Sequence, residues 1–217
     1  SAIGTKGSQT SSQTSGGGRI AVHYASLDAG ATILNAGRIS TASGAGGAGT
    51  VVLRRLGAPA RTLLRIDNGN GDGATTPIAQ ATEIYDDLEV RSGAKLVVPS
   101  GKVLALASDG VVTGHVGASV RPTITVLGRL SVPLVTSLEG LALTNQGEID
   151  QVRDLTVKAA TFFYDEAAAR NPLGLLTIAG TYEKRLRTQL VVEGPVVIQS
   201  GGVLTHAATA ASYPHNI

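Results

Sequence analysis

Residues 88–104 read LEVRSGAKLVVPSGKVL, and this stretch decides the fold class of the chain. Apolar and polar side chains alternate within it, so that Leu88 and Val90 lie on one face of an expected strand and Glu89 on the other. A turn at Gly101 then leads into the next apolar run. Each run is too short for a stable helix, and the stretch therefore predicts short strands that are half buried and joined by tight turns.

The same unit, a glycine turn followed within three residues by an apolar strand start, recurs along the chain. It is present at Gly37, Gly93, Gly101, Gly128, Gly147, Gly180 and Gly201. Several of these turns, such as Gly128 and Gly147, are separated by about 20 residues, a spacing typical of coils that present apolar residues inward at matched heights. We therefore expect an all-β fold, a parallel β-helix (β-solenoid) with irregular coils of about 20 residues.

Composition limits both the core and the chemistry of this 217-residue chain. Hydrophobic residues make up 42% of it but aromatic residues only 3%, so the core must consist mainly of valine, leucine, isoleucine and alanine. The chain is long enough to bury such a core. It has no cysteine, which excludes disulfides, thiolate metal sites, iron–sulfur clusters and cysteine nucleophiles.

The charge balance indicates no nucleic-acid or membrane partner. Lysine and arginine number 18 against 16 acids, a net charge of +2. No run approaches the roughly 18 consecutive apolar residues that a membrane-spanning helix requires. We expect a flexible Ser/Thr/Gly-rich arm at 1–18 and a single β-solenoid domain at 19–217. The absence of cysteine and methionine favours an extracellular or cell-surface location.

Residues 165–170 are the one place where the sequence predicts a helix. Asp165 suits an N-cap, Glu166 and Arg170 form an i,i+4 pair, and Asn171 with the proline after it ends the segment. We expect one short helical insertion that projects from a coil.

The densest polar cluster, at 67–73, resembles the start of a calcium-binding loop. Oxygen-bearing side chains stand at alternate positions, Asn68, Asn70 and Asp72, and a glycine follows. The twelfth position of such a loop is Ala79, which lacks the bidentate acid that calcium needs. These three residues are the calcium candidates, but a solvated turn is the favoured interpretation, and no other cofactor is expected.

Several carboxylate pairs have the spacing that an enzyme acting on polysaccharides requires. Glu148 and Asp150, two positions apart on one expected strand, fall within the separation of glycosidase acids. Adjacent acids on a wet strand face are usually only solvated. The four histidines are isolated and no Gly-x-Ser-x-Gly motif occurs, so no catalytic residue is assigned and the chain is expected not to be an enzyme.

Two clusters are expected to contact partners. One cluster contains three of the seven aromatic residues of the chain, Phe162, Phe163 and Tyr164. This segment either fills the interior of the solenoid or marks a contact surface. Arg54 and Arg55 begin a basic cluster that can meet acidic polysaccharide or a neighbouring subunit, although a solvated face is the simpler interpretation.

Four glycine-rich phrases resemble the repeats of large bacterial surface proteins. They are GGGRIAVHY at 16–24, GGAGTVVL at 46–53, LRIDNG at 64–69 and VVIQSGGVLTH at 196–206. The chain is in this respect similar to the passenger regions of autotransporters and to filamentous adhesins. The resemblance implies a secreted, right-handed parallel β-helix with a structural or adhesive role, and it carries over no catalytic residue.

Stacked coils form a rod whose end strands have free edges, which favours self-association. The leading expectation is an exported structural or adhesive module that forms a homo-oligomer, or that joins head to tail into a filament or fibre. Two alternatives of other classes remain. One is a lyase or hydrolase that acts on polysaccharide on the same fold, and the other is a fibre tip that binds cell-surface glycans.

Overall fold

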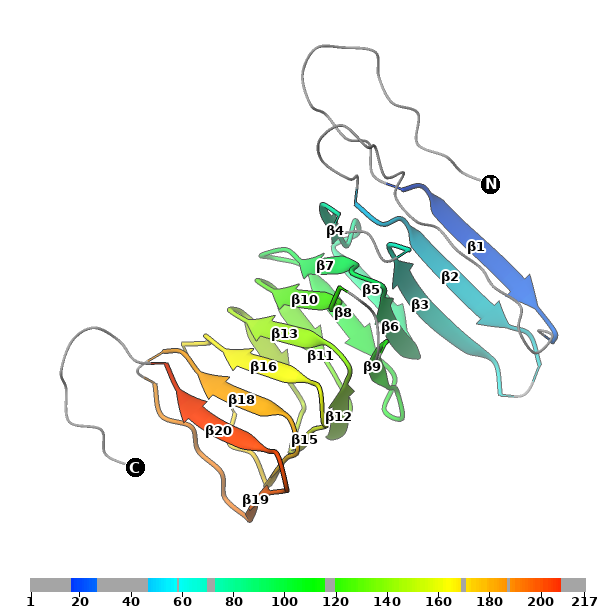
Figure 1. Ribbon diagram of the computed structural model, residues 1–217. Helices are drawn as coiled ribbons and strands as arrows, with labels where there is room; N and C mark the ends of the chain where they lie inside the picture. The colour runs from blue at the N-terminus through cyan, green and yellow to red at the C-terminus, as the bar shows by residue number, and fades with distance from the viewer. Residues whose placement is uncertain are drawn as a thin grey trace, which may run out of the picture.

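Alternating apolar and polar residues form short strands along the whole described part of the chain, and these strands stack into coils. The computed structural model describes residues 17–26, 47–57, 59–69, 73–115, 120–168, 171–186 and 188–207. The fold is all-β, a solenoid of about six turns, which confirms the predicted fold class (Figure 1).

Three sheets run along the solenoid, and each coil adds one strand to two or three of them (Figure 1). The first sheet contains, in spatial order, β1 (Arg19–Tyr24), β2 (Thr50–Arg55), β3 (Arg61–Asp67), β6 (Asp87–Arg91), β9 (Val112–Gly114), β12 (Val135–Glu139), β15 (Asp154–Val157), β17 (Leu175–Ile178) and β19 (Val196–Ile198). The second contains β4 (Thr75–Pro77), β7 (Lys95–Val98), β10 (Thr123–Val126), β13 (Ala142–Asn145), β16 (Phe162–Asp165), β18 (Thr181–Lys184) and β20 (Val203–His206). The third contains β5 (Thr82–Tyr85), β8 (Val103–Leu106), β11 (Arg129–Ser131) and β14 (Glu148–Asp150).

The coils are stacked in parallel register from β3 onward. Leu64 pairs with Leu88 of the next coil, and Leu88 pairs with Val112 of the coil after that. Nearer the C-terminus Thr136 pairs with Leu155, so that fewer residues separate one coil from the next. The C-terminal coils therefore have the predicted length, whereas the N-terminal coils are longer because their turns carry extra residues.

Strand alternation places the core between the three sheets. In one coil Leu88, Leu96 and Leu104 are contributed by the first, second and third sheets, and all three are buried. Their neighbours Glu89 and Lys95 lie on the outer faces and are partly exposed. Each coil repeats this arrangement, so the core is a continuous column of aliphatic side chains along the rod axis.

Glycine has two separate roles in the turns. Gly101 has a positive φ of 75°, a conformation that residues with a side chain rarely adopt. Gly128 instead allows close contact between coils, because a Cβ atom there would lie 2.2 Å from the carbonyl oxygen of Pro99. Both glycines were expected at turns. Only the stacked structure shows that Gly101 is needed for its backbone conformation and Gly128 for the close approach of two coils.

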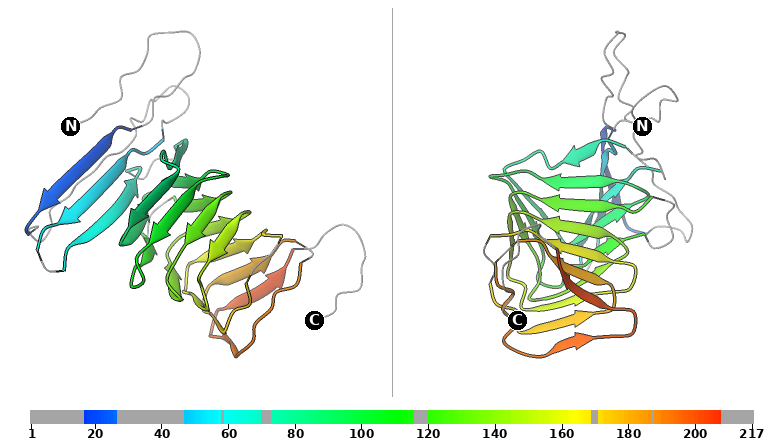
Figure 2. Two further views of the ribbon diagram at one scale, coloured as in Figure 1. Left: turned by 180° about the vertical axis from the view of Figure 1, so that it is seen from behind. Right: turned by 60° about the vertical axis from the view of Figure 1, so that its left-hand side comes forward.

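The N-terminal strands extend the first sheet beyond the first coil. β2 runs antiparallel to β3, and β1 pairs in parallel with β2 (Figure 2). Neither strand has a partner coil in the second or third sheet, so the regular coils begin at β3. The predicted arm lies outside the described residues, apart from Gly17 and Gly18.

The prediction of a helix at 165–170 is wrong for residues 165–168, the part of this segment that the structure describes. Asp165 is the last residue of β16, and residues 166–168 continue without helical structure. The inward direction of Asp165, set by strand alternation, overrides its preference for a helix cap. The described segments contain no helix, and hence none that is long and apolar enough to cross a membrane.

Candidate interaction surface

Strand alternation divides the aromatic segment of β16 between the core and the surface. Phe163 points inward, is fully buried, and has its ring centroid 5.0 Å from that of Tyr182 in the next coil. Phe162 and Tyr164 lie on the outer face of the second sheet, with centroids 6.1 Å apart. The two interpretations that the sequence left open therefore apply to different residues of the same segment.

An arginine covers each of the two outer rings. The guanidinium carbon of Arg121 lies 4.0 Å from the centroid of Phe162, and that of Arg185 lies 3.7 Å from the centroid of Tyr164. These distances are well within the range of cation–π attraction. On these ring faces a guanidinium takes the position that a stacked sugar would need.

Arg185 is further held by two carboxylates. Its Nε donates to Oε1 of Glu183 at 2.8 Å, and its Nη1 donates to Oε1 of Glu166 at 3.1 Å. The hydrogen bond to Glu183 raises the pKa of Arg185 most, and the bond to Glu166 raises it further. Around Tyr164 the charges of Arg185, Glu183 and Glu166 are therefore paired with one another, whereas Arg121, over Phe162, is an exposed cation.

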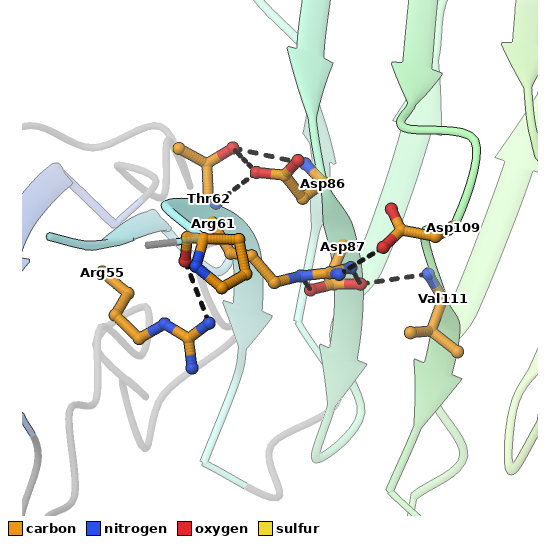
Figure 3. A network of polar contacts seen from close by, with 8 residues as sticks. Arg55, Arg61, Thr62, Asp86, Asp87, Asp109 and Val111 are labelled. Carbon is orange, nitrogen blue, oxygen red and sulfur yellow. Dashed lines mark hydrogen bonds and ion pairs between the residues drawn. The ribbon is translucent and has the colours of Figure 1, made fainter. Parts of the chain in front are cut away.

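The basic cluster that begins at Arg54 and Arg55 is part of the hairpin between β2 and β3. Both residues are exposed at the end of β2. Arg55 donates through Nη2 to the carbonyl oxygen of Pro59 at 3.0 Å, so it closes the hairpin turn (Figure 3). Arg54 remains an exposed cation on the first sheet.

Arg61, at the start of β3, joins three successive turns of the solenoid (Figure 3). Its Nε and Nη2 donate to both carboxylate oxygens of Asp87, at 3.1 and 2.8 Å. Its Nη1 donates to Oδ2 of Asp109 at 2.7 Å. The bonds to Asp87 and then Asp109 raise the pKa of Arg61. Asp87 also accepts from the backbone N–H of Val111 at 3.1 Å.

Asp86, next to Asp87 in the chain, binds Thr62, the residue that follows Arg61 (Figure 3). Its Oδ2 accepts from both the hydroxyl and the backbone N–H of Thr62, which lower the pKa of Asp86, the hydroxyl most. The adjacent acids Asp86 and Asp87 therefore bind separate partners, Thr62 and Arg61, and stabilise the stack.

The acids considered for catalysis, Glu148 and Asp150, share one arginine. Arg129 of the preceding coil lies 2.9 Å through Nε from Oε2 of Glu148 and 3.8 Å through Nη1 from Oδ2 of Asp150. These three side chains lie on the outer face of the third sheet. The arrangement is a partly exposed ion-pair cluster between neighbouring coils.

Of the calcium candidates, only Asn68 belongs to the described residues, and it is buried. The preceding Asp67 accepts from the backbone N–H of Gly69 at 2.9 Å, which forms a local turn. Asn70 and Asp72 lie outside the described residues, so a calcium site of these three remains a prediction. Within the described ranges, no three histidine or acidic side chains are grouped as metal ligands.

The C-terminal coil exposes the side chains that earlier coils bury. Val196, Ile198 and Leu204 occupy the inward columns of β19 and β20, with exposed fractions of 45%, 52% and 40%. The residues that they pair with in the previous coil, Leu176, Ile178 and Tyr182, are fully buried. The sequence indicated an open end, but the exposed columns are visible only in the stacked structure.

The opposite end of the solenoid is polar and covered. Glu83 of β5 occupies an inward column, in register with Leu104 of the next coil, and is only 8% exposed. Its carboxylate accepts from the backbone N–H groups of Ala79 and Gln80 and from the Tyr85 hydroxyl, at 2.8, 3.1 and 2.8 Å. An inward charge of this kind is a known way to prevent further strands from adding to a sheet.

These hydrogen bonds offset the cost of burying the Glu83 carboxylate. Burial by itself raises the pKa of Glu83, but the bonds from Gln80, Tyr85 and Ala79, with Arg19 3.8 Å away, bring it below its ordinary value. The same burial and the bond to Glu83 raise the pKa of the Tyr85 hydroxyl. Glu83 is therefore stabilised in its charged form.

A backbone segment also covers this end. Gly17 donates to the carbonyl oxygen of Gly47 at 2.8 Å, and the hydroxyl of Thr76, on β4, donates to the carbonyl oxygen of Ala48. Ala48 is buried. The two ends of the rod thus differ in polarity and in coverage.

No protein-family model matches this chain, and neither the curated proteins nor the solved structures contain a match. Its function must therefore be inferred from its own geometry.

Proposed function

We propose that this protein is a non-enzymatic, exported structural module, a length of β-solenoid rod that associates with a second copy of itself through its C-terminal coil. The observation that carries the proposal is the exposure of inward apolar columns at that end. In every earlier coil the same columns are covered by the coil that follows.

The strand edges at this end support the proposal. β19 and β20 each have a strand partner on one side only within the described chain. Their free edges carry unpaired backbone groups next to apolar side chains, which is the arrangement used in strand addition. Only one acidic residue, Glu193, lies between 188 and 207, so little charge opposes the approach of another strand.

The polarity of the rod favours contact between two C-terminal ends. The head-to-tail filament expected from sequence would place an apolar coil against the buried Glu83 and the covering segment at 47–49. That contact would disturb the hydrogen bonds of a buried carboxylate, which is costly. Two C-terminal coils present matching apolar columns and free edges, and a two-fold axis makes such a contact self-complementary.

Export rests on other observations. The chain lacks cysteine and methionine, which suits an oxidising exterior, and its glycine-rich phrases resemble those of bacterial surface proteins. Self-association of exposed rods is the adhesive property that we propose. Antibody labelling of intact cells that make the protein, with and without added protease, tests this part, and signal found only after lysis would contradict it.

Sedimentation analysis across a range of concentrations tests the self-association. We expect a dimer that dissociates on dilution and that Ile198→Lys converts to a monomer, because the lysine places a charge in the apolar contact. The matched control is Ile84→Lys, on exposed β5 at the opposite end, which should leave the dimer intact.

Two results would overturn the proposal. A protein that stays monomeric at every concentration shows that the apolar end does not mediate self-association. Association that grows into open polymers, or that resists Ile198→Lys, shows that other surfaces make the contact.

A further inference from the structure

A polar column runs through the core of the C-terminal half of the rod. Asn145, Asp165 and Lys184 stand in register on β13, β16 and β18, on three successive coils. All three side chains point inward and are buried, and the Asp165 side chain has no exposed surface. The third sheet ends at β14, in the coil that holds Asn145, so the coils that hold Asp165 and Lys184 have no strand in the third sheet.

The ammonium group of Lys184 lies directly against the Asp165 carboxylate. Nζ is 3.1 Å from Oδ2, and it also donates to the carbonyl oxygen of Ala167 at 3.2 Å. The backbone N–H of Ala167 donates to the other carboxylate oxygen, Oδ1, at 3.3 Å. Ala167 therefore binds both partners of the pair, one through its N–H and the other through its carbonyl.

Further donors polarise the carboxyl group. The Tyr182 hydroxyl donates to Oδ2 at 2.8 Å, and Nδ2 of Asn145 lies 3.5 Å from Oδ1. Tyr182 is fully buried, and its ring packs against the fully buried ring of Phe163, with the centroids 5.0 Å apart. A charged pair in such surroundings bears a large desolvation cost, which a neutral group in the same place does not.

We propose that Lys184 and Asp165 condense into an intramolecular amide that links β18 to β16. One proton of the ammonium passes to Oδ2, and the lone pair of Nζ then attacks Cγ. A second proton follows to Oδ2 as the Cγ–Oδ2 bond breaks, and Oδ2 leaves with both protons as one water molecule. The Nζ–Cγ bond replaces the Cγ–Oδ2 bond, and no oxidant or co-reactant is required.

The surrounding groups already suit both the reaction and its product. The donors on Oδ1, the Ala167 N–H and Asn145 Nδ2, lie where negative charge develops during the attack. In the product, Oδ1 keeps the bond from the Ala167 N–H, and the new amide N–H keeps the bond to the Ala167 carbonyl. The buried pair of charges disappears.

The cross-link would join two neighbouring coils next to the exposed C-terminal end. It closes a loop between residues 165 and 184 and so restricts the unfolded chain. The two coils directly before the exposed C-terminal coil would then resist separation along the rod axis. This inference does not depend on the proposed self-association.

Mass spectrometry of the denatured full chain tests the bond. We expect an intact mass lower than that of the sequence by one water molecule, in all or part of the protein. Asp72 and Asp109 each precede a glycine, where local dehydration gives the same loss, so the bond must also be located in a digest.

Trypsin should leave peptide 159–170 joined to 171–185, because cleavage after an acylated Lys184 is blocked. The joined pair has the same mass as the linear peptide 159–185 that incomplete digestion would leave. Fragmentation distinguishes the two, because the joined pair has two N-termini, Ala159 and Asn171, whereas the linear peptide has only Ala159. Lys184→Arg, which removes the primary amine, and Asp165→Ala, which removes the acyl carbon, should each show the full mass of its own sequence.

A matched ion pair serves as the control within the same protein. Lys158 Nζ lies 2.7 Å from Oε2 of Glu139, but this pair is exposed and should stay uncoupled. A wild-type protein with the full sequence mass, or dehydration located elsewhere than at Asp165 and Lys184, would overturn the inference and leave a buried ion pair.

Discussion

Arg61 and Asp87, which are 26 residues apart in the chain, are joined by two parallel hydrogen bonds between successive coils. The guanidinium and the carboxylate meet in the fork-to-fork geometry that gives the strongest ion pairs. Both side chains are partly buried, with less than a third of their surface exposed. This contact, with its extension to Asp109, connects the hairpin at the N-terminal end to the coils below it.

Replacing Arg61 with alanine should loosen the N-terminal coils. The loss of two charged hydrogen bonds to Asp87 should cost about 1–2 kcal/mol of local stability. Hydrogen exchange of residues 86–91 measures the effect. Arg129→Ala is the matched control, because its pair with Glu148 is about half exposed and should contribute less than about 1 kcal/mol. Equal losses in the two variants would contradict the assignment.

The two phenylalanines of β16 should respond very differently to truncation. Phe163→Ala leaves a cavity beside Tyr182 in the core and should cost about 3–5 kcal/mol. Phe162→Ala, on the outer face, loses its contact with Arg121 and should cost about 1 kcal/mol or less. Urea unfolding followed by circular dichroism compares them, and similar midpoints would show that the alternation on β16 is misassigned.

The two roles of glycine can be separated by mutation. Gly128→Ala places a Cβ against the carbonyl oxygens of Pro99 and Lys102, at 2.2 and 2.4 Å, which should force the coils apart at a cost of about 2–3 kcal/mol. Gly101→Ala meets no atom within 4 Å and should cost about 1 kcal/mol for its left-handed backbone alone. Thermal unfolding of the two variants measures the difference, and the reverse order would contradict it.

The N-terminal end should lose stability in acid. The pKa of Glu83 lies below its ordinary value of 4.5, so its contribution is complete above that value and is lost as the pH falls through the lower pKa of the folded state. Asp86 acts in the same direction from its ordinary value of 3.8. The hydrogen-exchange protection factors of residues 79–86, which correct for the slower intrinsic exchange in acid, should therefore fall below about pH 4.5.

Glu83→Gln provides the check on this pH dependence. The variant keeps an acceptor oxygen but no titrating group, so its N-terminal end should be less stable near neutral pH and less sensitive to acid. Glu148→Gln, on the exposed face of β14, should keep the acid response of the wild type. An unchanged acid response in Glu83→Gln would show that other groups cause it.

The sequence alone was enough to predict the fold class and much of the inward pattern. In residues 88–104 the period of two identifies Leu88, Leu96 and their equivalents as core residues, because successive side chains of a strand point to opposite faces. The same rule, applied to β16, would have placed Phe163 inside and Phe162 outside. It would also have placed Asp165 inside, where the sequence was interpreted as a helix cap.

Contacts between coils were decided only by the tertiary structure. The pairs of Arg61 with Asp87 and of Asp165 with Lys184 join residues 26 and 19 positions apart, and the unequal lengths of the coils hide which residues come into register. The difference between the two ends is hidden for the same reason, because Glu83 is recognised as an inward charge only through its alignment with Leu104. The alternation of side chains within a strand depends only on neighbouring residues and can be predicted from the sequence. The register between stacked coils depends on the number of residues in every turn, which the sequence alone does not define.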